Sequence, residues 1–357
     1  MVLPVICVLC LVNDSTATYR PRLDLEAGHY LKAQAEADAQ IRRNAYNPLA
    51  WAAKAQALLA LQRVPEALAA AEKAVSLNGA LADALLARGL ARGGAAIQQR
   101  NLSSLRGISG ALDDLEAATK ADPTCVSAWM ALGLAYQQLP GLLGGSTRKA
   151  LACAESLRRV NPARGDLLQG LVLSMDERWN EALPYFGRAL AQAPTDPEIL
   201  CGYLDALGSR ETRRGMGSDE QKRRLAAEAH RLAPTARGKA RALEAVSLAL
   251  LDADQPEEAW RLAQEALEQV DAPSLLRLHL GKIAARSGRH REEGLAYLDR
   301  VLREPLEGGS GGYPAAHWRK GQILKDLGRT EEARVEAQAT LRLDSKHPGA
   351  RKLLDSL

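Results

Sequence analysis

The stretch VSAWMALGLAYQQL, residues 126–139, carries the pattern that decides the fold of this chain. Counted from Trp129, apolar or small residues follow three, four and seven places later, and an α-helix brings positions at this spacing to one face. These residues are Leu132, Gly133 and Tyr136. Glycine costs about 1 kcal/mol in a helix relative to alanine. Its place on the apolar face therefore predicts that a second helix approaches closely there.

We call the apolar face formed by these residues the stripe. A second helix with its own pattern follows each helix that carries a copy of the stripe. In EALPYFGRALAQAP, residues 181–194, the small residue Ala182 is followed by Phe186 four places later and by Ala189 seven places later. Equivalent small positions recur at intervals of 32 to 44 residues, which predicts a repeat made of two helices. We call these positions the openers, and all of them except Lys222 are small: Ala33, Ala67, Ala111, Ala150, Ala182, Lys222, Ala259, Gly294 and Ala333. The glycine of the first helix recurs at Gly89, Gly170, Gly281 and Gly321.

The period, the stripe, the small opener and a proline near the end of several repeats resemble tetratricopeptide repeats. The resemblance covers nearly everything after residue 24 and implies an all-α, right-handed superhelical solenoid of helix-turn-helix repeats. An ordinary helical bundle is the alternative, and the shared register of the repeats argues against it. We expect an N-terminal capping half repeat over 18–47, eight repeats over 48–346 and a C-terminal capping helix over 347–357. Second helices are expected to end at Pro123, Pro162, Pro194 and Pro234.

Three segments account for departures from a period of 34 residues, and we expect them to be loop insertions. They are GGAAIQQRNLSS after the helix with Gly89, PGLLGGS after Tyr136, and GGSGG at 308–312. The second of them could instead cradle a phosphate, but that requires GxxxxGK[ST] between a strand and a helix. Here no glycine directly precedes Lys149, and the preceding element is a helix. The phosphate-binding alternative is therefore disfavoured.

The same segment resembles the enlarged turn of exported bacterial tetratricopeptide proteins, including the T components associated with TRAP transporters. We expect Pro140 to stop the first helix and Ser146 to cap the next one. Leu142 and Leu143 are expected to tuck under the turn. Whether the loop contacts a partner or is merely tolerated stays open.

Composition and motifs give little indication of catalysis, of metal binding, or of binding to nucleic acid or membranes. The 47 basic and 43 acidic residues leave a formal net charge of +4, too small to indicate a nucleic-acid-binding or membrane-surface protein. Six histidines are spread over different repeats, without HExxH or a Cys/His cluster at metal-ligand spacing. No motif such as GxSxG indicates a nucleophile. We expect no enzyme activity, no metal and no cofactor, and we expect Cys125, Cys153 and Cys201 to be small core residues.

The opening residues 2–12, VLPVICVLCLV, form an apolar run of about half the ~20 residues that a membrane-spanning helix needs. The run resembles the apolar part of a secretory signal, although the usual charged residues before it are missing. Small residues at Ser15 and Ala17 would allow cleavage before Thr18. We therefore expect a signal peptide over 1–17 and an exported, periplasmic protein. A mis-assigned start and a cytoplasmic protein are the alternative.

In tetratricopeptide arrays the first helix of each repeat lines the concave groove, so the resemblance implies binding of a partner protein, as a peptide or a helix, along these helices. The clamp that holds a chaperone's terminal carboxylate in some family members is absent, because Ala52, Met130 and Leu167 stand where lysine is expected. The sequence does not indicate the oligomeric state. The candidate groove residues are Gln56, Met130, Leu134, Gln137, Leu171, Glu244, Lys282, Trp318, Gln322 and Lys325, with Leu248 and Leu278 in the same register.

A nucleic-acid-associated adaptor is the competing hypothesis. The segment 210–241 holds ten arginine or lysine residues against four acidic ones. It contains no aromatic residue on which bases could stack, which disfavours nucleic acid as the partner.

Overall fold

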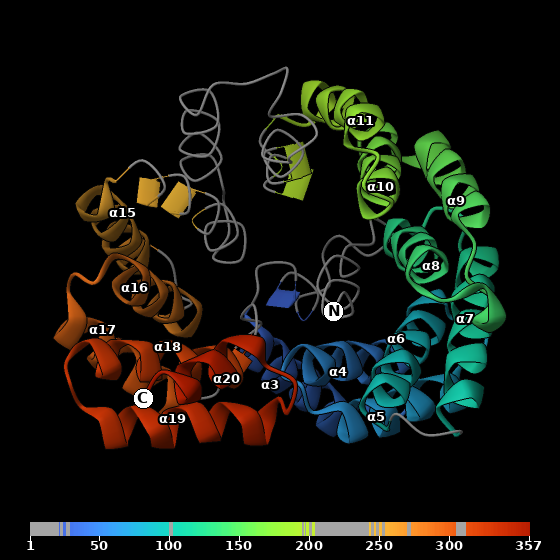
Figure 1. Ribbon diagram of the computed structural model, residues 1–357. Helices are drawn as coiled ribbons and strands as arrows, with labels where there is room; N and C mark the ends of the chain where they lie inside the picture. Colours follow the sequence, from blue (N-terminus) through green and yellow to red (C-terminus); the bar gives the residue numbers. More distant parts are fainter. Residues whose placement is uncertain are drawn as a thin grey trace. The chain divides into compact units, whose positions relative to one another are not determined.

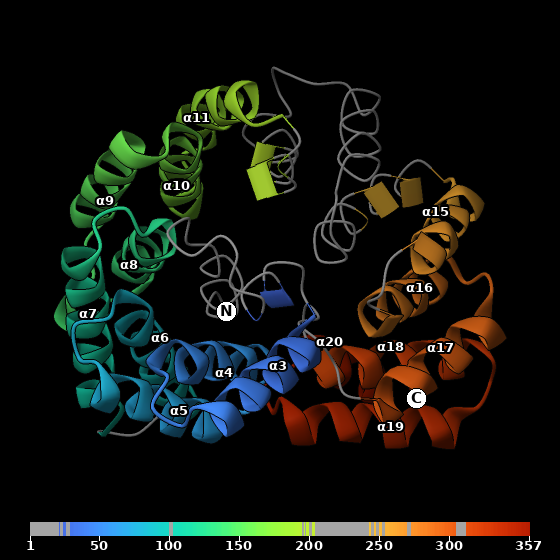
Figure 2. The same cartoon turned by 180° about the vertical axis from the view of Figure 1, so that it is seen from behind.

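A computed structural model describes residues 29–99, 103–194, 254–269, 273–304 and 312–357, with isolated residues between 21 and 25, 196 and 203, and 243 and 251. All elements of this described part are α-helices except one short 3-10 turn, which confirms the all-α fold (Figures 1 and 2). The chain divides into two compact units, residues 1–217 and 218–357. Several expectations lie outside the described residues: the signal peptide at 1–17, the basic segment at 210–241, Cys201, Lys222, Pro234, Glu244 and Leu248.

In the first unit, helices that follow one another in the chain pack as hairpins, α4 with α5, α6 with α7, α8 with α9, and α10 with α11. The first helices of these hairpins also contact one another in order, from α4 through α6 and α8 to α10. This is the packing of a helical-repeat solenoid. The helices are α3 (Tyr30–Arg43), α4 (Pro48–Ala60), α5 (Val64–Leu77), α6 (Ala82–Gln99), α7 (Ser103–Ala121), α8 (Val126–Gln138), α9 (Thr147–Val160), α10 (Pro162–Met175) and α11 (Trp179–Gln192), with the 3-10 turn η2 (Gly141–Leu143).

The second unit is built in the same way. Helix α15 packs on α16, the pairs α16·α17 and α18·α19 are hairpins, and α20 packs on both α18 and α19. Helices α16 and α18 contact each other as first helices of successive repeats. The helices are α15 (Pro256–Gln269), α16 (Pro273–Ser287), α17 (Arg291–Arg303), α18 (Gly312–Asp326), α19 (Thr330–Leu343) and α20 (Pro348–Asp355).

The small openers occupy the positions that the periodicity predicts. Every opener that the structure describes is buried. In all the described second helices except α7 the opener is the fourth residue, and its amide hydrogen-bonds to the carbonyl of the residue just before the helix. In α7 the opener is Ala111, the ninth residue, because this helix begins earlier.

The stripe glycines mark close helix contacts, as predicted. A Cβ at Gly133 would lie 2.7 Å from Leu168 of α10 and 3.3 Å from Cys153 of α9. A Cβ at Gly281 would lie 2.4 Å from Leu298 of α17. Real Cβ atoms essentially never lie within 3.0 Å of another side chain, so glycine lets α8 approach α10 and α16 approach α17.

The expected loop at GGAAIQQRNLSS is wrong. Residues 93–99 continue α6, and α7 begins at Ser103. Gly94 lies where α6 packs on α4 and α5, since a Cβ there would lie 3.1 Å from Leu59 and 3.6 Å from Val64, whereas one at Gly93 would make an ordinary contact of 4.0 Å with Ala111 of α7. Packing of α6 against its neighbouring helices outweighs the low helix propensity of glycine.

The described prolines that were expected to end the second helices lie just after them, two residues beyond the last helical residue. Pro162 is the first residue of α10, a position where its missing amide is tolerated, and α9 has already ended at Val160. Pro123 and Pro194 lie two residues beyond the ends of α7 and α11. The turns between repeats depend instead on a side-chain oxygen that accepts the amide two residues later. This bond is made by Asn44, Asn78, Asp122 and Asp344, at 2.9–3.1 Å.

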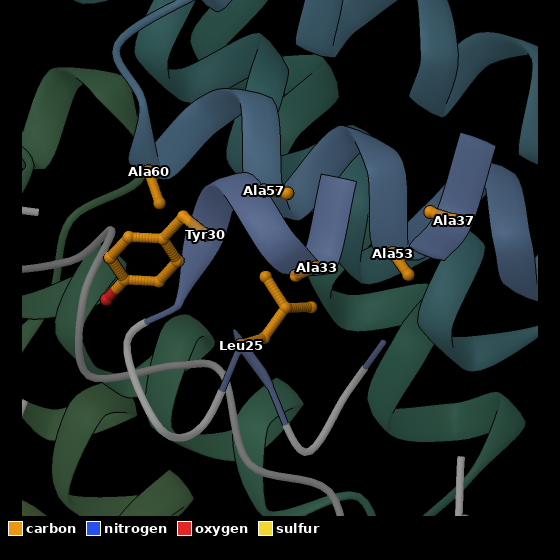
Figure 3. Close-up of a cluster of buried hydrophobic side chains, with 7 residues drawn as sticks. All are labelled: Leu25, Tyr30, Ala33, Ala37, Ala53, Ala57 and Ala60. Atoms are coloured by element: carbon orange, nitrogen blue, oxygen red, sulfur yellow. The ribbon is translucent and has the colours of Figure 1, made fainter. Parts of the chain in front are cut away.

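At the start of the first unit, small residues bring α3 against α4. Tyr30 and Leu25 are fully buried in a cluster with alanines of both helices. Figure 3 shows the Tyr30 ring beside Ala60 and Leu25 pointing toward Ala33. The role of 18–47 as a capping half repeat remains a prediction.

Several turns inside the repeats contain a residue in the left-handed region, at the end of the first helix. Glycine fills this position at Gly328, with φ +74°, whereas Gln62 and Glu177 adopt φ values of 62° and 60°. A residue with a Cβ pays roughly 1–2 kcal/mol in this region.

Exchanging residue types at two of these positions should change stability in opposite directions. We expect Glu177→Gly to raise the free energy of unfolding by about 0.5–1 kcal/mol and Gly328→Ala to lower it by about 1 kcal/mol. A Cβ at Gly328 would meet nothing within 4 Å, so the lost stability would come from the backbone conformation alone and not from a steric clash. Urea unfolding followed by circular dichroism measures the free energy of unfolding of both variants. Changes of the same sign in the two variants would contradict the left-handed conformation described for these positions.

Candidate protein-binding surface

The contacts of α18 show which side of it is free of its hairpin partner. His317 Nδ1 lies 2.6 Å and Lys320 Nζ 2.7 Å from carboxylate oxygens of Glu336, on α19. At 100° per residue, Arg319 and Gln322 lie about half a turn from this contact. They therefore share the side of α18 that is turned away from α19.

Helix α16 is oriented in the same way. Arg277 forms an ion pair with Glu304, at the end of α17, and Gly281 packs on Leu298 of α17. Lys282 and Arg286 lie on the opposite side of α16. Because α16 and α18 are in contact, we call Lys282, Arg286, Arg319 and Gln322 together the inner face of the second unit.

Two other predicted site residues lie beside the inner face, where α18 meets α20. The centre of the Trp318 ring is 4.8 Å from that of His347, and a Cβ at Gly349 would lie 2.5 Å from the indole. Lys325 Nζ donates a hydrogen bond of 2.7 Å to Ser356 Oγ. Trp318 and Lys325 therefore flank the inner face and help hold α20.

In the first unit, most of the predicted groove residues are packing residues in this structure. Met130 is 1% exposed and Leu134 0%, and Gln56 is also buried. Gln137 and Leu171 are half-buried, and the Gln137 amide donates to Asp176 Oδ1 at 2.5 Å. Buried side chains offer no surface to a partner. Ala52, Leu167 and Leu278 are buried as well.

Sequence reasoning missed Arg319. The candidate positions were taken from one stripe of each first helix, and Arg319 lies one residue beyond that stripe. Its neighbours are unusual for an arginine. The guanidinium carbon lies 3.9 Å from the centre of the Trp318 ring, and Nη1 donates to Gln322 Oε1 at 2.9 Å. Burial, and to a lesser extent the nearby charge of Arg286, lower the pKa of Arg319 to about 10.

Other arginines, half-buried except for the exposed Arg188, hold a carboxylate between helices. Arg88 and Arg92 of α6 bind Asp114 of α7 at 2.5 and 2.8 Å. Arg158 of α9 and Arg188 of α11 bind Asp166 of α10 at 3.0 and 3.2 Å. Both aspartates are almost fully buried, so these ion pairs belong to the packing of the repeats. Arg319 differs from these arginines because an amide and an indole surround it instead of an acid.

The loop at 139–146 is a capped turn. Helix α8 ends at Gln138, η2 follows Pro140, and Gly144 is left-handed with φ 88°. Ser146 Oγ accepts the amide of Lys149 at 3.3 Å and caps α9, as expected. The expectation that Leu142 tucks under the turn is wrong, because the side chain is 100% exposed. The 3-10 turn directs Leu142 outward, while Leu143 is half-buried.

Gly145 should be indispensable for this turn. A Cβ there would lie 1.6 Å from the carbonyl oxygen of Leu139, whereas one at Gly141 would meet nothing within 4 Å. We expect Gly145→Ala to lower the free energy of unfolding by about 2–3 kcal/mol, through forced backbone movement. Gly141→Ala, in the same loop, is the control and should leave it nearly unchanged. Thermal unfolding compares the two, and equal effects would contradict the turn geometry.

Candidate chemistry is sparse in the described part of the chain. It contains no group of three or more histidine, cysteine, aspartate or glutamate side chains placed to hold a metal. Cys125 and Cys153 are buried and in no disulfide, as expected of core residues, and burial raises the pKa of Cys153 to about 12. None of the described helices is both long and apolar enough to cross a membrane.

Residues 98–140 and residues 314–347 each match a family model described as tetratricopeptide repeat. These two segments are tetratricopeptide repeats. The first spans α7 and α8, and the second spans α18 and α19. Tetratricopeptide repeats generally mediate protein–protein interaction, and proteins of this fold are typically non-catalytic scaffolds. The second match contains Arg319, Gln322 and their flanking residues.

Solved structures of other helical-repeat proteins resemble this chain. The human IFIT1 dimer with m7Gppp-AAAA has a TM-score of 0.51 at 15% identity, over 94% of this chain and 78% of that one. A thermophilic tetratricopeptide protein of Thermus thermophilus has a TM-score of 0.46 at 23% identity, over 53% of this chain and 97% of that one. Pseudomonas aeruginosa pilF has a TM-score of 0.45 at 18% identity, over 66% of this chain and 99% of that one. The IFIT1 likeness supports the fold alone, and no curated sequence is significantly similar to the chain.

Proposed function

We propose that this protein is a non-catalytic scaffold that binds a peptide or a helix of a partner protein along its first helices. The observation that carries the proposal is the inner face of α16 and α18. Its side chains lie away from the hairpin partners, and the contacts of Arg319 with Trp318 and Gln322 stay within α18. A surface of this kind on tetratricopeptide repeats supports protein binding.

Site-specific crosslinking in the full-length protein tests the proposal. A photoreactive amino acid replaces Gln322 on the inner face or, as the control, Val335, which is 57% exposed on α19. In an extract of the source organism, position 322 should form protein adducts that survive nuclease treatment, and position 335 should form none. Equal adducts from both positions would contradict binding on the inner face. Adducts that vanish with nuclease would favour the nucleic-acid adaptor instead.

We also propose that the protein is exported to the periplasm, with 1–17 removed, and works beside a transporter as the T components of TRAP systems do. The short apolar run and the small residues at Ser15 and Ala17 support this proposal. N-terminal sequencing after expression in a Gram-negative host should give Thr18 as the first residue. Recovery in the cytoplasm with residues 2–12 intact would contradict export.

A further inference from the structure

A histidine caps the first turn of α20. The ring nitrogen Nδ1 of His347 accepts the backbone amide of Ala350 at 3.1 Å. A backbone amide can only donate, so the imidazole that makes this bond is the neutral form, with a lone pair on Nδ1. Protonation turns Nδ1 into a donor and places a positive charge at the positive end of the helix dipole. The cap therefore exists only while His347 is unprotonated.

Helix α4 carries the same cap with a residue that does not titrate. It begins at Pro48 directly after Asn47, as α20 begins at Pro348 directly after His347. The side-chain oxygen of Asn47 accepts the amide of Ala50, three residues later, at 3.3 Å. An amide side chain keeps this acceptor in acid and in base. His347 thus supplies the same kind of bond through a group that acid can switch off.

Helix α20 is short, so its cap matters for whether its first turn forms. It has eight residues, and isolated helices shorter than about 12–15 residues are marginal in water. Its buried side chains are Ala350 and Leu353. At the far end, Ser356 Oγ accepts a hydrogen bond from Lys325 of α18. Loss of the cap would therefore loosen the first turn while the far end stays attached.

Charged groups reach His347 from α18 and from the turn after α19. Burial has the largest effect and lowers the pKa of His347, the carboxylate of Asp344 raises it, the charge of Arg319 lowers it, and the backbone of His347 raises it. The net pKa lies below the ordinary value of 6.5. The folded protein thus binds this proton less readily than the unfolded chain. The stabilising contribution of the cap is present above pH 6.5 and is lost as the pH falls through the lowered pKa.

The neighbouring tryptophan offers a protonated ring no free partner. The His347 ring lies 4.8 Å from the Trp318 ring, at an interplanar angle of 57°. The guanidinium carbon of Arg319 already lies 3.9 Å from the centre of the same indole. A second cation beside this indole would meet the like charge of Arg319, which opposes its binding there.

We propose that His347 is a pH-sensitive switch that releases the first turn of α20 from α18 when the imidazole is protonated. Gly349, in this turn, packs against Trp318, since a Cβ there would lie 2.5 Å from the indole. Release of the turn would therefore expose Trp318, which flanks the inner face. The switch concerns the contact between α20 and α18 and does not depend on the proposed function.

Hydrogen exchange in the full-length protein, followed by mass spectrometry, tests the switch. Protection of the α20 amides is measured at about pH 7.5 and about pH 5, each relative to the intrinsic exchange rate at that pH, so that the opening of the helix is compared. We expect protection to fall about 10-fold in acid, in line with the typical contribution of an N-cap. Amides at the start of α4, which Asn47 caps, should keep their protection in the same samples.

Three variants assign the effect to the His347 ring. His347→Asn places the capping residue of α4 in α20, so protection should be high at both pH values. His347→Ala removes the acceptor, so protection should be low at both. His290→Asn changes a histidine that also precedes a helix but accepts no capping bond, and the pH dependence of α20 should remain.

Several results would overturn the proposal. Equal protection of α20 in the native chain at both pH values would show that protonation does not release the turn. An acid-induced loss in His347→Asn as large as in the native chain would mean that another group titrates. Native protection of His347→Ala at about pH 7.5 would show that the bond from Ala350 to His347 does not hold the turn.

Discussion

Phe186→Ala is expected to lower the free energy of unfolding by about 3–5 kcal/mol, the range typical of a buried phenylalanine. Phe186 is 1% exposed on α11 and fills the space that two glycines leave open. A Cβ at Gly170 would lie 2.9 Å from its ring, and one at Gly202 would lie 2.7 Å from it. Since neither glycine has a side chain that could move into the gap, the cavity should stay large. Urea unfolding followed by circular dichroism measures the loss.

A double variant tests whether Phe186 and Gly170 share this space. Gly170→Ala alone should destabilise the protein by overpacking, whereas in the Phe186→Ala background it should be tolerated or stabilising. Val335→Ala removes exposed apolar atoms from α19 and serves as the control, with little expected effect. A loss below about 1 kcal/mol for Phe186→Ala would contradict the packing described for α10 and α11.

Asp114→Ala is expected to cost about 3–5 kcal/mol, because it leaves two half-buried arginines without their shared carboxylate. Asp114 is 4% exposed and binds Arg88 through both of its oxygens, at 2.5 and 2.9 Å, with Arg92 at 2.8 Å. Denaturant unfolding at low and high salt measures the effect. Salt should change it little, since a buried pair is poorly screened.

The matched control for Asp114 is an ion pair of similar length on the surface. Arg178 and Glu181 lie 2.6 Å apart, but both side chains are exposed. Glu181→Ala should therefore leave the unfolding midpoint nearly unchanged. If the Asp114 and Glu181 variants lose similar stability, burial is not the reason that Asp114 matters.

The positions predicted correctly are those at which a residue's size reflects the distance between two helices. A small opener such as Ala182 and a stripe glycine such as Gly281 are local signals, because only small side chains fit where backbones approach. Their recurrence in one register was enough to predict a repeat of two helices. The same logic failed at Gly93 and Gly94, where glycines taken as a loop lie inside α6. Propensity is a weak preference, and the packing of α6 against its neighbouring helices outweighed it.

The exposure of the candidate groove residues was predicted less well, because burial depends on what the other helices cover. Met130 and Leu134 belong to the same stripe as Gln137, yet the first two are buried and the third is half-buried. Asp114 lies 26 residues from Arg88, and nothing in either local segment marks them as a pair. The outward direction of Leu142 follows from the geometry of a 3-10 turn that the residue types did not specify.

The sequence by itself determined the two-helix repeat, its register and the places where helices approach, because all three follow from side-chain size at helical spacing. Only the tertiary structure decided which charged residues have a partner. Arg88 and Arg319 are both arginines of a first helix, but Asp114 of α7 faces one of them, and an indole and an amide surround the other. The difference depends on which side chains the neighbouring helices bring within hydrogen-bonding distance, and helical periodicity within one segment does not encode that arrangement.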